Sequence, residues 1–497
     1  MAVGTQLRKF GSDTLMYGLG NLLQGAISFL LFPIYARVLT SVEFGIQELI
    51  LSFTAIATSL MLFGLDSSSA RFYFDAQTSQ EKKDVISTWL SIEILLSLPI
   101  TILLVLFSRP FSQIVYQDAL LAPYFSLGAL TIPLSLMAMV FSLVLRLNYR
   151  PSRYNLMLLS GALTQAVVAI LMVVVFHKGI QGVLWAMIIS GLVQVLMGIA
   201  MTRGQLGLRI SKPLLTPMLR YGLPLLPTSI ALWVMNYSNR YFLNNYVGLA
   251  ELGYYGIAVK IATLVSFAVS AFLKSWAIFG FDLYSRDKEL ARQTYRQTLT
   301  HYLLISGVLV TGLGVFSEDL IRVLATKAYL SVSSLIPVLA FSAVLWGVVD
   351  IVGIGYFLVR KSYYTTIATL LGAGVAILAN WLLIPLLGIY GAGLSILFGN
   401  IVIVIFAFVA GQKHFRVAYE YRKLVGILIF SGLAIFSAQL FTTAASDWSL
   451  WKFGLRCLIF LAFLASLLVT RILPLANITQ WLSKTLLPRF KDRQLPK

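Results

Sequence analysis

The residues best suited to chemistry in this sequence lie together on one apolar segment, at 219–246. Asn236, Asn239 and Arg240 are three or four residues apart, so they share one face of a helix. Amide side chains hydrogen-bond to hydroxyl groups, and a guanidinium binds phosphate through two parallel N–H groups. The pattern predicts a site that binds an anion together with polar groups. A second interpretation stays open, because tyrosine and polar residues are also common where a helix reaches the membrane interface.

Lys260 is the second candidate, in the apolar segment at 250–280. It lies about 14 Å of helix rise beyond Glu251, which places it close to the middle of a membrane. A charge at the bilayer centre costs about 2.5–3.5 kcal/mol, so such residues usually face a cavity or a partner. No acid close in the sequence neutralises Lys260 or Arg240. We therefore expect these two cations to act together as an anion clamp.

The other intramembrane polar residues form two groups. Three could extend the binding site along the first apolar segment: Asn21, Gln24 and Arg37. Three acids could each carry a coupling proton or pair with Arg or Lys: Glu48, Glu93 and Asp350. The single cysteine and the three histidines show no metal-ligand spacing, so no metal and no other cofactor is expected.

Composition determines what kind of element carries these residues. Of 497 residues, 59% are hydrophobic and 11% are charged, whereas soluble domains have about a quarter charged. No soluble fold of this length can bury so much apolar surface. Runs of roughly 18 or more nearly uncharged residues recur, and each can span a hydrocarbon core of about 30 Å. We predict an all-α membrane protein with about fourteen spans: 14–38, 43–66, 86–108, 123–146, 155–176, 180–200, 219–246, 250–280, 297–317, 334–358, 364–386, 389–410, 422–442 and 450–472.

The net charge of +19 is distributed unevenly along the chain. With the N-terminus inside, most Lys and Arg fall on inside segments, and the outside segments hold only Arg37, Arg109, Lys178, Arg322, Lys327 and Lys452. This asymmetry predicts a multi-pass protein with both termini cytoplasmic. Because the charges are scattered over short loops and a tail, nucleic acid is not an expected partner. The tail at 476–497 is basic and amphipathic, which predicts a helix on the inner membrane surface.

The two halves of the sequence resemble each other at an offset of 208 to 210 residues. Four matches occur in the same order: Leu39–Gly45 with Val247–Gly253, Phe107–Ser108 with Phe316–Ser317, Arg150–Tyr154 with Arg360–Tyr364, and Gly179–Gly182 with Gly388–Gly391. Six spans separate each motif from its copy, so the repeat is parallel, about an axis along the membrane normal. Transporters commonly bind substrate between such halves.

The repeat divides the chain into four parts. We predict an N-lobe at 1–210, a C-lobe at 211–415, two added spans at 416–475 and the tail at 476–497. Pro224 and Pro227 stand near the start of the span at 219–246, where they predict a break or a bending point.

Two motifs carry a family resemblance that covers essentially the whole chain. The stretch Pro33–Gly45 resembles a signature of the polysaccharide transporter family (O-antigen flippases of the Wzx type) in the MOP exporter superfamily. Asn239–Arg240 and Gly248–Tyr255 resemble its counterpart in the second half. The resemblance implies two six-helix lobes in a V around a central cationic cavity, with two added helices. One departure is Asn239, where relatives often have aspartate.

The resemblance also implies a function. The expected substrate is an anionic oligosaccharide on undecaprenyl diphosphate, moved from the cytoplasmic to the periplasmic leaflet of the bacterial inner membrane by alternating access. Arg240 and Lys260, with Arg37, would hold the diphosphate or acidic sugars. Membrane lipids and polysaccharide polymerase or assembly proteins are the expected partners.

Three other functions remain open. A multidrug or cation-coupled exporter of the same superfamily would be centred on cavity carboxylates, which are outnumbered here by cations on the spans at 219–246 and 250–280. A lipid II flippase would share the fold. A membrane-embedded polysaccharide polymerase, ligase or glycosyltransferase would need catalytic groups outside the bilayer, where Glu318–Asp319 is the only acid pair. The repeat places that pair opposite Arg109–Pro110, which favours a structural turn, so no enzyme is expected.

Overall fold

The computed structural model describes residues 2–442, 449–470 and 472, apart from the side chains of 2–15, 274, 275, 277, 278 and 442. The described residues form helices and connections, with no strand among them, which confirms the all-α expectation. The first half contains α1 (Ala2–Val38), α2 (Ser41–Met61), α3 (Leu65–Asp75), α4 (Ser79–Leu106), α5 (Ser108–Tyr116), η1 (Ala119–Leu121), α6 (Ala122–Leu147), α7 (Pro151–Ala169), η2 (Ile170–Val175) and α8 (Gly179–Met201).

The second half repeats this order and adds two helices. It contains α9 (Lys212–Gly222), η3 (Leu223–Leu225), α10 (Leu226–Tyr246), α11 (Leu249–Arg286), α12 (Lys288–Val315), α13 (Ser317–Leu324), η4 (Lys327–Val332), α14 (Leu335–Val352), α15 (Ile354–Leu358), α16 (Tyr363–Leu387), α17 (Ile389–His414), α18 (Tyr421–Thr442) and α19 (Leu450–Val469). Thirteen helical stretches among the described residues are long and apolar enough to cross a membrane. The tail predicted at 476–497 lies outside the described residues.

The span predicted at 219–246 is divided between α9, η3 and α10. Pro224 lies in η3 and Pro227 lies in the first turn of α10, so the predicted break is confirmed. Proline lacks a backbone N–H and is favoured at a helix start, although single prolines also lie inside α1, α4, α6 and α16 without ending them.

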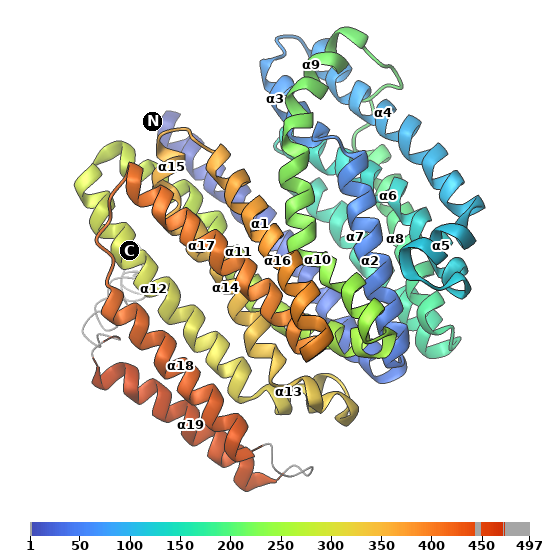
Figure 1. The fold of residues 1–497 in the computed structure, drawn as a ribbon. Coiled ribbons are helices and arrows are strands. Elements are labelled where there is room, and N and C mark those ends of the chain that lie inside the picture. Colours follow the sequence, from blue (N-terminus) through green and yellow to red (C-terminus); the bar gives the residue numbers. More distant parts are fainter. Residues whose placement is uncertain (1, 443–448, 471, 473–497) are drawn as a thin grey trace, which may run out of the picture.

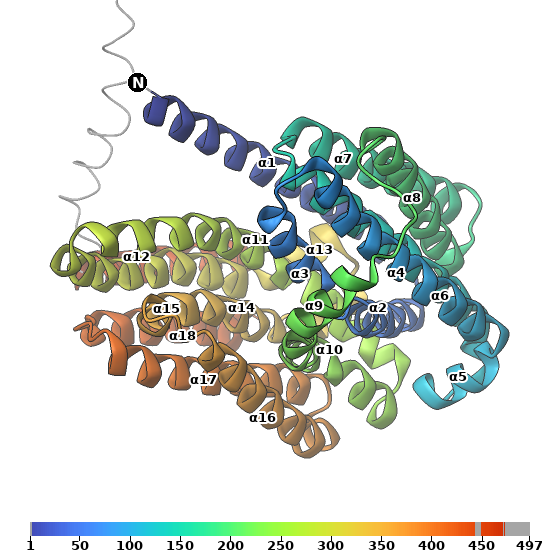
Figure 2. The same cartoon turned by 90° about the horizontal axis from the view of Figure 1, so that it is seen from above.

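The helices form two bundles, which come together at the end of the molecule where α13 lies and diverge toward the end where α15, α3 and α9 lie (Figures 1 and 2). We call α1–α8 the N-lobe and α10–α17 the C-lobe. α9 packs on α3 and α4, whereas α10 packs on α16 and α2. A Cβ on Gly222 would lie only 2.5 Å from the carbonyl oxygen of Phe63, so α9 approaches the N-lobe closely. The span predicted at 219–246 therefore packs on the N-lobe in α9 and belongs to the C-lobe in α10, and the change lies at η3.

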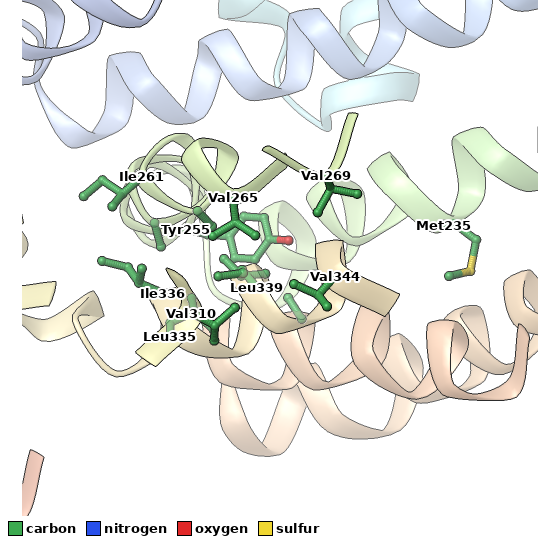
Figure 3. Packing of buried hydrophobic residues seen from close by; sticks show 14 of the residues in the cluster. Met235, Tyr255, Ile261, Val265, Val269, Val310, Leu335, Ile336, Leu339 and Val344 are labelled. Atoms are coloured by element: carbon green, nitrogen blue, oxygen red, sulfur yellow. The ribbon is translucent and has the colours of Figure 1, made fainter. Parts of the chain in front are cut away.

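The core of the C-lobe forms around α11 and α14. Figure 3 shows Tyr255, Val265 and Val269 of α11 beside Leu339 and Val344 of α14, and all five side chains are buried. The sequences of these two helices are apolar on several faces, because each helix packs on more than one neighbour.

The lobes meet where α2 and α11 begin, in a contact that the sequence repeat makes reciprocal. A Cβ on Gly45 would lie 2.0 Å from the carbonyl oxygen of Leu249, and a Cβ on Gly253 would lie 1.8 Å from that of Ser41. Ser41 and Gly45 correspond to Leu249 and Gly253 at the offset of 208 (249 minus 41). One turn further on, Gly256 faces Glu48, its own counterpart in the repeat. We call these residues of α2 and α11 the lobe junction. Only glycine allows the two backbones to approach this closely.

A second reciprocal contact lies at the same end of the molecule. Arg37, near the end of α1, donates a hydrogen bond to the carbonyl of Val323 in α13. Asn244, near the end of α10, donates to the carbonyl of Tyr116 in α5 at 2.9 Å. Each lobe thus binds the short amphipathic helix of the other.

The two added helices form a hairpin that packs on α12 (Figure 1). Arg456 of α19 is buried, and it forms ion pairs with Glu318 and, at 2.7 Å, with Asp319 in the first turn of α13. The acid pair Glu318–Asp319, predicted to lie outside the bilayer, therefore binds a neighbouring helix.

We expect Gly253→Val to hold the lobes apart at the junction. Helix axes lie 8–10 Å apart depending on the side chains between them, so the separation of α2 and α11 should grow by about 2 Å. Spin labels at the exposed Leu120 and Leu386, in a Cys457→Ser background, would report the change as a longer distance between the lobes. Gly432→Val is the matched control, because a Cβ there meets no atom within 4 Å. Equal distances in the two variants would contradict the assignment.

We expect Arg456→Ala to lower the thermal stability of the purified protein. The change leaves two carboxylates without their buried partner, and losing one member of a buried pair costs about 3–5 kcal/mol. Thermal unfolding followed by tryptophan fluorescence would measure the effect. Arg286→Ala removes an arginine whose side chain is 74% exposed, so it should leave the unfolding temperature nearly unchanged.

Candidate functional site

The largest described cavity lies within the C-lobe, among α10, α11, α14 and α17. Its volume is about 570 Å³, within the range of small-molecule sites, roughly 300–1,000 Å³. We call it the C-lobe cavity. Its polar and aromatic lining comes from four helices: Asn236, Tyr237, Arg240, Tyr255, Thr263, Ser266, Ser270, Ser342, Trp346 and Asn400. Amides, hydroxyls and a tryptophan beside one cation suit a polar ligand that carries a negative charge.

Arg240 is the only charged residue among the described residues of this lining, and it is held by several partners. Its Nε donates to Oε2 of Glu48 in α2 at 3.2 Å, and both side chains are 5% exposed. Its Nη1 donates to Oδ1 of Asn239 at 2.8 Å and to the carbonyl of Asn236. The guanidinium carbon also lies 5.3 Å from the ring centroid of Tyr255. No acid close in the sequence neutralises Arg240, but Glu48 reaches it from the other lobe.

Asn239 orients Arg240. It is buried, and its Nδ2 donates to the hydroxyl of Tyr255 at 2.6 Å while its Oδ1 accepts from Arg240. The amide thus donates to one neighbour and accepts from the other. An ionised aspartate could only accept, so Asn239 suits this arrangement without adding a second negative charge beside Arg240.

Lys260 lies in a second cavity of about 320 Å³, which we call the N-lobe cavity. Its walls come from α1, α2, α7, α8 and α11. Lys260 is partly buried and has no ion pair with a described residue. The hydroxyl of Tyr35 and Oε1 of Gln47 also line this cavity, buried and without a hydrogen-bond partner in the described part of the chain. Unpartnered buried polar atoms are costly, so this wall is suited to a polar ligand.

The two cavities are neighbours along α11. Thr263 lines both, and Lys260 lies one turn beyond Gly256, where the contact of the lobe junction ends. The structure therefore places Arg240 and Lys260 in adjoining cavities, one on the side of each lobe.

The other predicted site residues lie outside both linings. Arg37 binds α13 at the end of the molecule where the lobes meet. Asn21 donates to the carbonyl of Tyr17 at 2.9 Å and accepts from Tyr154 at 3.1 Å, which ties α1 to α7. Gln24 is partly buried beside Gly25, and only Gly25 lines the N-lobe cavity.

Of the three acids, Glu48 pairs with Arg240, which was one of its two predicted roles. Glu93 is buried and accepts a hydrogen bond from Trp89 Nε1 at 2.9 Å. Asp350 is partly buried, and its main-chain carbonyl accepts from Trp276 at 3.4 Å. Neither Glu93 nor Asp350 lines the two cavities.

Sequence reasoning missed part of this site. Gln47 and Asn400 are polar residues within apolar spans, the same signal that selected Asn236, and it would have found them. Tyr255 and Trp346 gave no such signal, because aromatic residues are frequent throughout the chain.

Residues 34–334 match a family model described as "Polysaccharide biosynthesis protein". The chain belongs to this family. None of the curated proteins matches the sequence.

Solved transporters share the fold of this polysaccharide biosynthesis protein. A lipid II flippase MurJ in an inward closed conformation aligns with a TM-score of 0.72 and 14% identity, over 92% of this chain and 99% of its own. An inward-facing multidrug resistance MATE family transporter of the MOP superfamily aligns at 0.67 and 16%, over 78% and 94%. An outward-facing MATE family transporter aligns at 0.57 and 18%, over 80% and 93%. The expected family and superfamily fold are confirmed.

We expect both cavities to admit a water-soluble reagent. In a Cys457→Ser background, cysteines at Ser28 of the N-lobe cavity and Ser266 of the C-lobe cavity should react with a charged thiosulfonate. The reaction should be roughly tenfold faster than at a buried position, because reactivity needs a solvated thiolate. Ser395→Cys is the control, since Ser395 is buried and donates to the carbonyl of Gly391. Similar rates at all three positions would mean that the cavities are closed.

Proposed function

We propose that this protein is a flippase that moves an undecaprenyl-diphosphate-linked oligosaccharide across the bacterial inner membrane, from the cytoplasmic to the periplasmic leaflet. The observation that carries the proposal is the pair of adjoining cavities, whose described lining residues include one cation each and no acid. Such a site fits a ligand with separate anionic groups and many hydroxyls. The family and the fold support the same function.

Each part of the substrate has a matching group. Arg240 would bind the diphosphate, and Lys260 a second phosphate oxygen or an acidic sugar. Asn236, Asn400 and Trp346 would bind sugars in the C-lobe cavity, since amides suit hydroxyl groups and aromatic faces suit sugar rings. In this proposal Arg37, Asn21 and Asn239 support the site from outside it.

Alternating access follows from the way the lobes meet. The distribution of Lys and Arg favours a periplasmic position for the lobe junction, so the structure would be an inward-facing state with both termini cytoplasmic. The higher TM-scores for the inward structures support this assignment. The lobes as divided at residue 210 would rock about the junction, with the break at η3 as a bending point. Glu93 and Asp350 are the candidates for coupling transport to a proton. Polysaccharide polymerase or assembly proteins are the candidate partners.

Two relatives in fold act on other ligands. A multidrug or cation-coupled exporter would be expected to centre on cavity carboxylates, and the described residues of the two linings include none. A lipid II flippase is the second candidate, because its ligand shares the polyprenyl diphosphate, which the same two cations would bind.

A strain lacking the protein and any redundant flippase tests the proposal. We expect it to accumulate lipid-linked oligosaccharide on the inner leaflet, and the wild-type protein to restore export. Arg240→Ala should restore export at least about tenfold less well, since one charge-assisted contact is worth about that factor in affinity. Arg71→Ala, which removes a 64% exposed arginine paired with Asp75, should restore export fully.

The same strain separates the candidates. Normal export without the protein would overturn the proposed substrate. Accumulation of the peptidoglycan precursor in place of the oligosaccharide would identify lipid II as the cargo.

A further inference from the structure

The ion pair between Arg240 and Glu48 uses only part of the guanidinium. Nε donates to Glu48 at 3.2 Å, and Nη1 donates to Asn239 and to the carbonyl of Asn236. Within the described residues, Nη2 donates to no acceptor. Nε and Nη2 lie on one edge of the guanidinium, where their N–H groups are parallel. Glu48 therefore accepts from only one of the two parallel N–H groups that could bind an oxyanion.

A phosphate group is suited to accept hydrogen bonds from both of these N–H groups. Two parallel N–H···O bonds to an oxyanion are stronger and more directional than one. Arg240 lines the C-lobe cavity, whereas Glu48 approaches it from α2 and is not part of that lining. An anion that enters the cavity can bind Arg240 through both parallel N–H groups only if it takes Nη2 and competes with Glu48 for Nε.

We propose that Glu48 is an internal counter-ion of Arg240 which the phosphate of the substrate displaces, and that this displacement loosens the lobe junction. The inference rests on the proposed function in taking a polyprenyl diphosphate as the ligand. It assigns to Glu48 a positioning role that couples binding in the cavity to the contact between the lobes.

The coupling follows from where Glu48 lies. It is 4% exposed and its side chain packs against Gly256 at the lobe junction. A buried carboxylate that loses its partner is strongly unfavourable. The cost falls when α2 moves away from α10 and α11 and water reaches the carboxylate. Ligand binding at Arg240 therefore favours separation of the lobes at the junction.

Binding of farnesyl diphosphate to the purified full-length protein, measured by calorimetry, tests the exchange. Glu48→Gln keeps the shape of the side chain without its charge, so it should bind the probe about tenfold more tightly than the wild type. Glu420→Gln is the matched control. It removes an equally paired carboxylate, which binds Arg296 and Lys423 far from the cavities, and it should bind as the wild type does. Farnesol, which has the same chain without phosphate, should not distinguish the variants.

Glu48→Asp provides a second variant. It keeps the charge but shortens its reach, so it should raise the affinity by a smaller factor, and it replaces Glu48→Gln if that protein does not fold. Spin labels at Leu120 and Leu386 provide the second readout. Farnesyl diphosphate should lengthen this distance in the wild type, whereas in Glu48→Gln, which leaves no buried carboxylate to hydrate, the probe should lengthen it less.

The outcomes separate this inference from the proposed function. Equal affinity of the wild type and both Glu48 variants would overturn the exchange, and so would binding that leaves the distance unchanged. Absence of binding to every protein would also overturn it, while the export assay would still decide the function independently. A gain of affinity in Glu48→Gln, with normal oligosaccharide export in the strain without the protein, would support the exchange with a different phosphorylated ligand.

Discussion

The close approach of α2 and α11 at their first turns is the constraint on which the rest of the structure depends. Two backbones can meet at this distance only where one residue of each contact lacks a side chain, and Gly45 and Gly253 each supply that space to the other helix. In a membrane, apolar side chains gain little by leaving lipid for protein, so close packing must hold the lobes together. The two glycines make such packing possible over a short stretch.

The consequences can be followed along α11. Leu249, Gly253, Gly256 and Lys260 recur at three- or four-residue spacing and so form one face of the helix. The first three contact α2, and the fourth lines the N-lobe cavity. On this face the long cationic side chain of Lys260 follows the two glycines, Gly253 and Gly256. The lobes therefore diverge at Lys260. The same helix thus closes one end of the molecule and supplies polar groups to both cavities.

Sequence patterns predicted the elements well because membrane spans are defined locally. Fourteen predicted segments correspond to the helices of the structure, and the break lies where Pro224 and Pro227 stand three residues apart. The signature at Pro33–Gly45 was recognised, but its physical meaning was not. Gly45 matters because of Leu249, and a helix pairing between distant segments cannot be inferred from the periodicity of either one.

The candidate site shows the same limit. Depth and chemistry selected Arg240 and Lys260 correctly as intramembrane cations, and both line cavities. The counter-ion of Arg240 is 192 residues away, on the other lobe, so a search for nearby acids could not find it. Arg37 was selected by charge and depth as well, yet it binds a carbonyl of α13. Local sequence gives the depth of a charge, but the packing of the lobes decides which partner it finds.

The duplication also explains why the junction is not symmetric. Glu48 and Gly256 are counterparts in the repeat and face each other. Two glutamates here would place like charges in contact within a buried interface, and two glycines would leave Arg240 without its counter-ion. One acid opposite one glycine avoids both costs and leaves room for the carboxylate to reach Arg240. Because the two halves of the sequence differ at this position, one lobe provides the anion and the other provides the cation. Both lie at the lobe junction, where the lobes meet and separate.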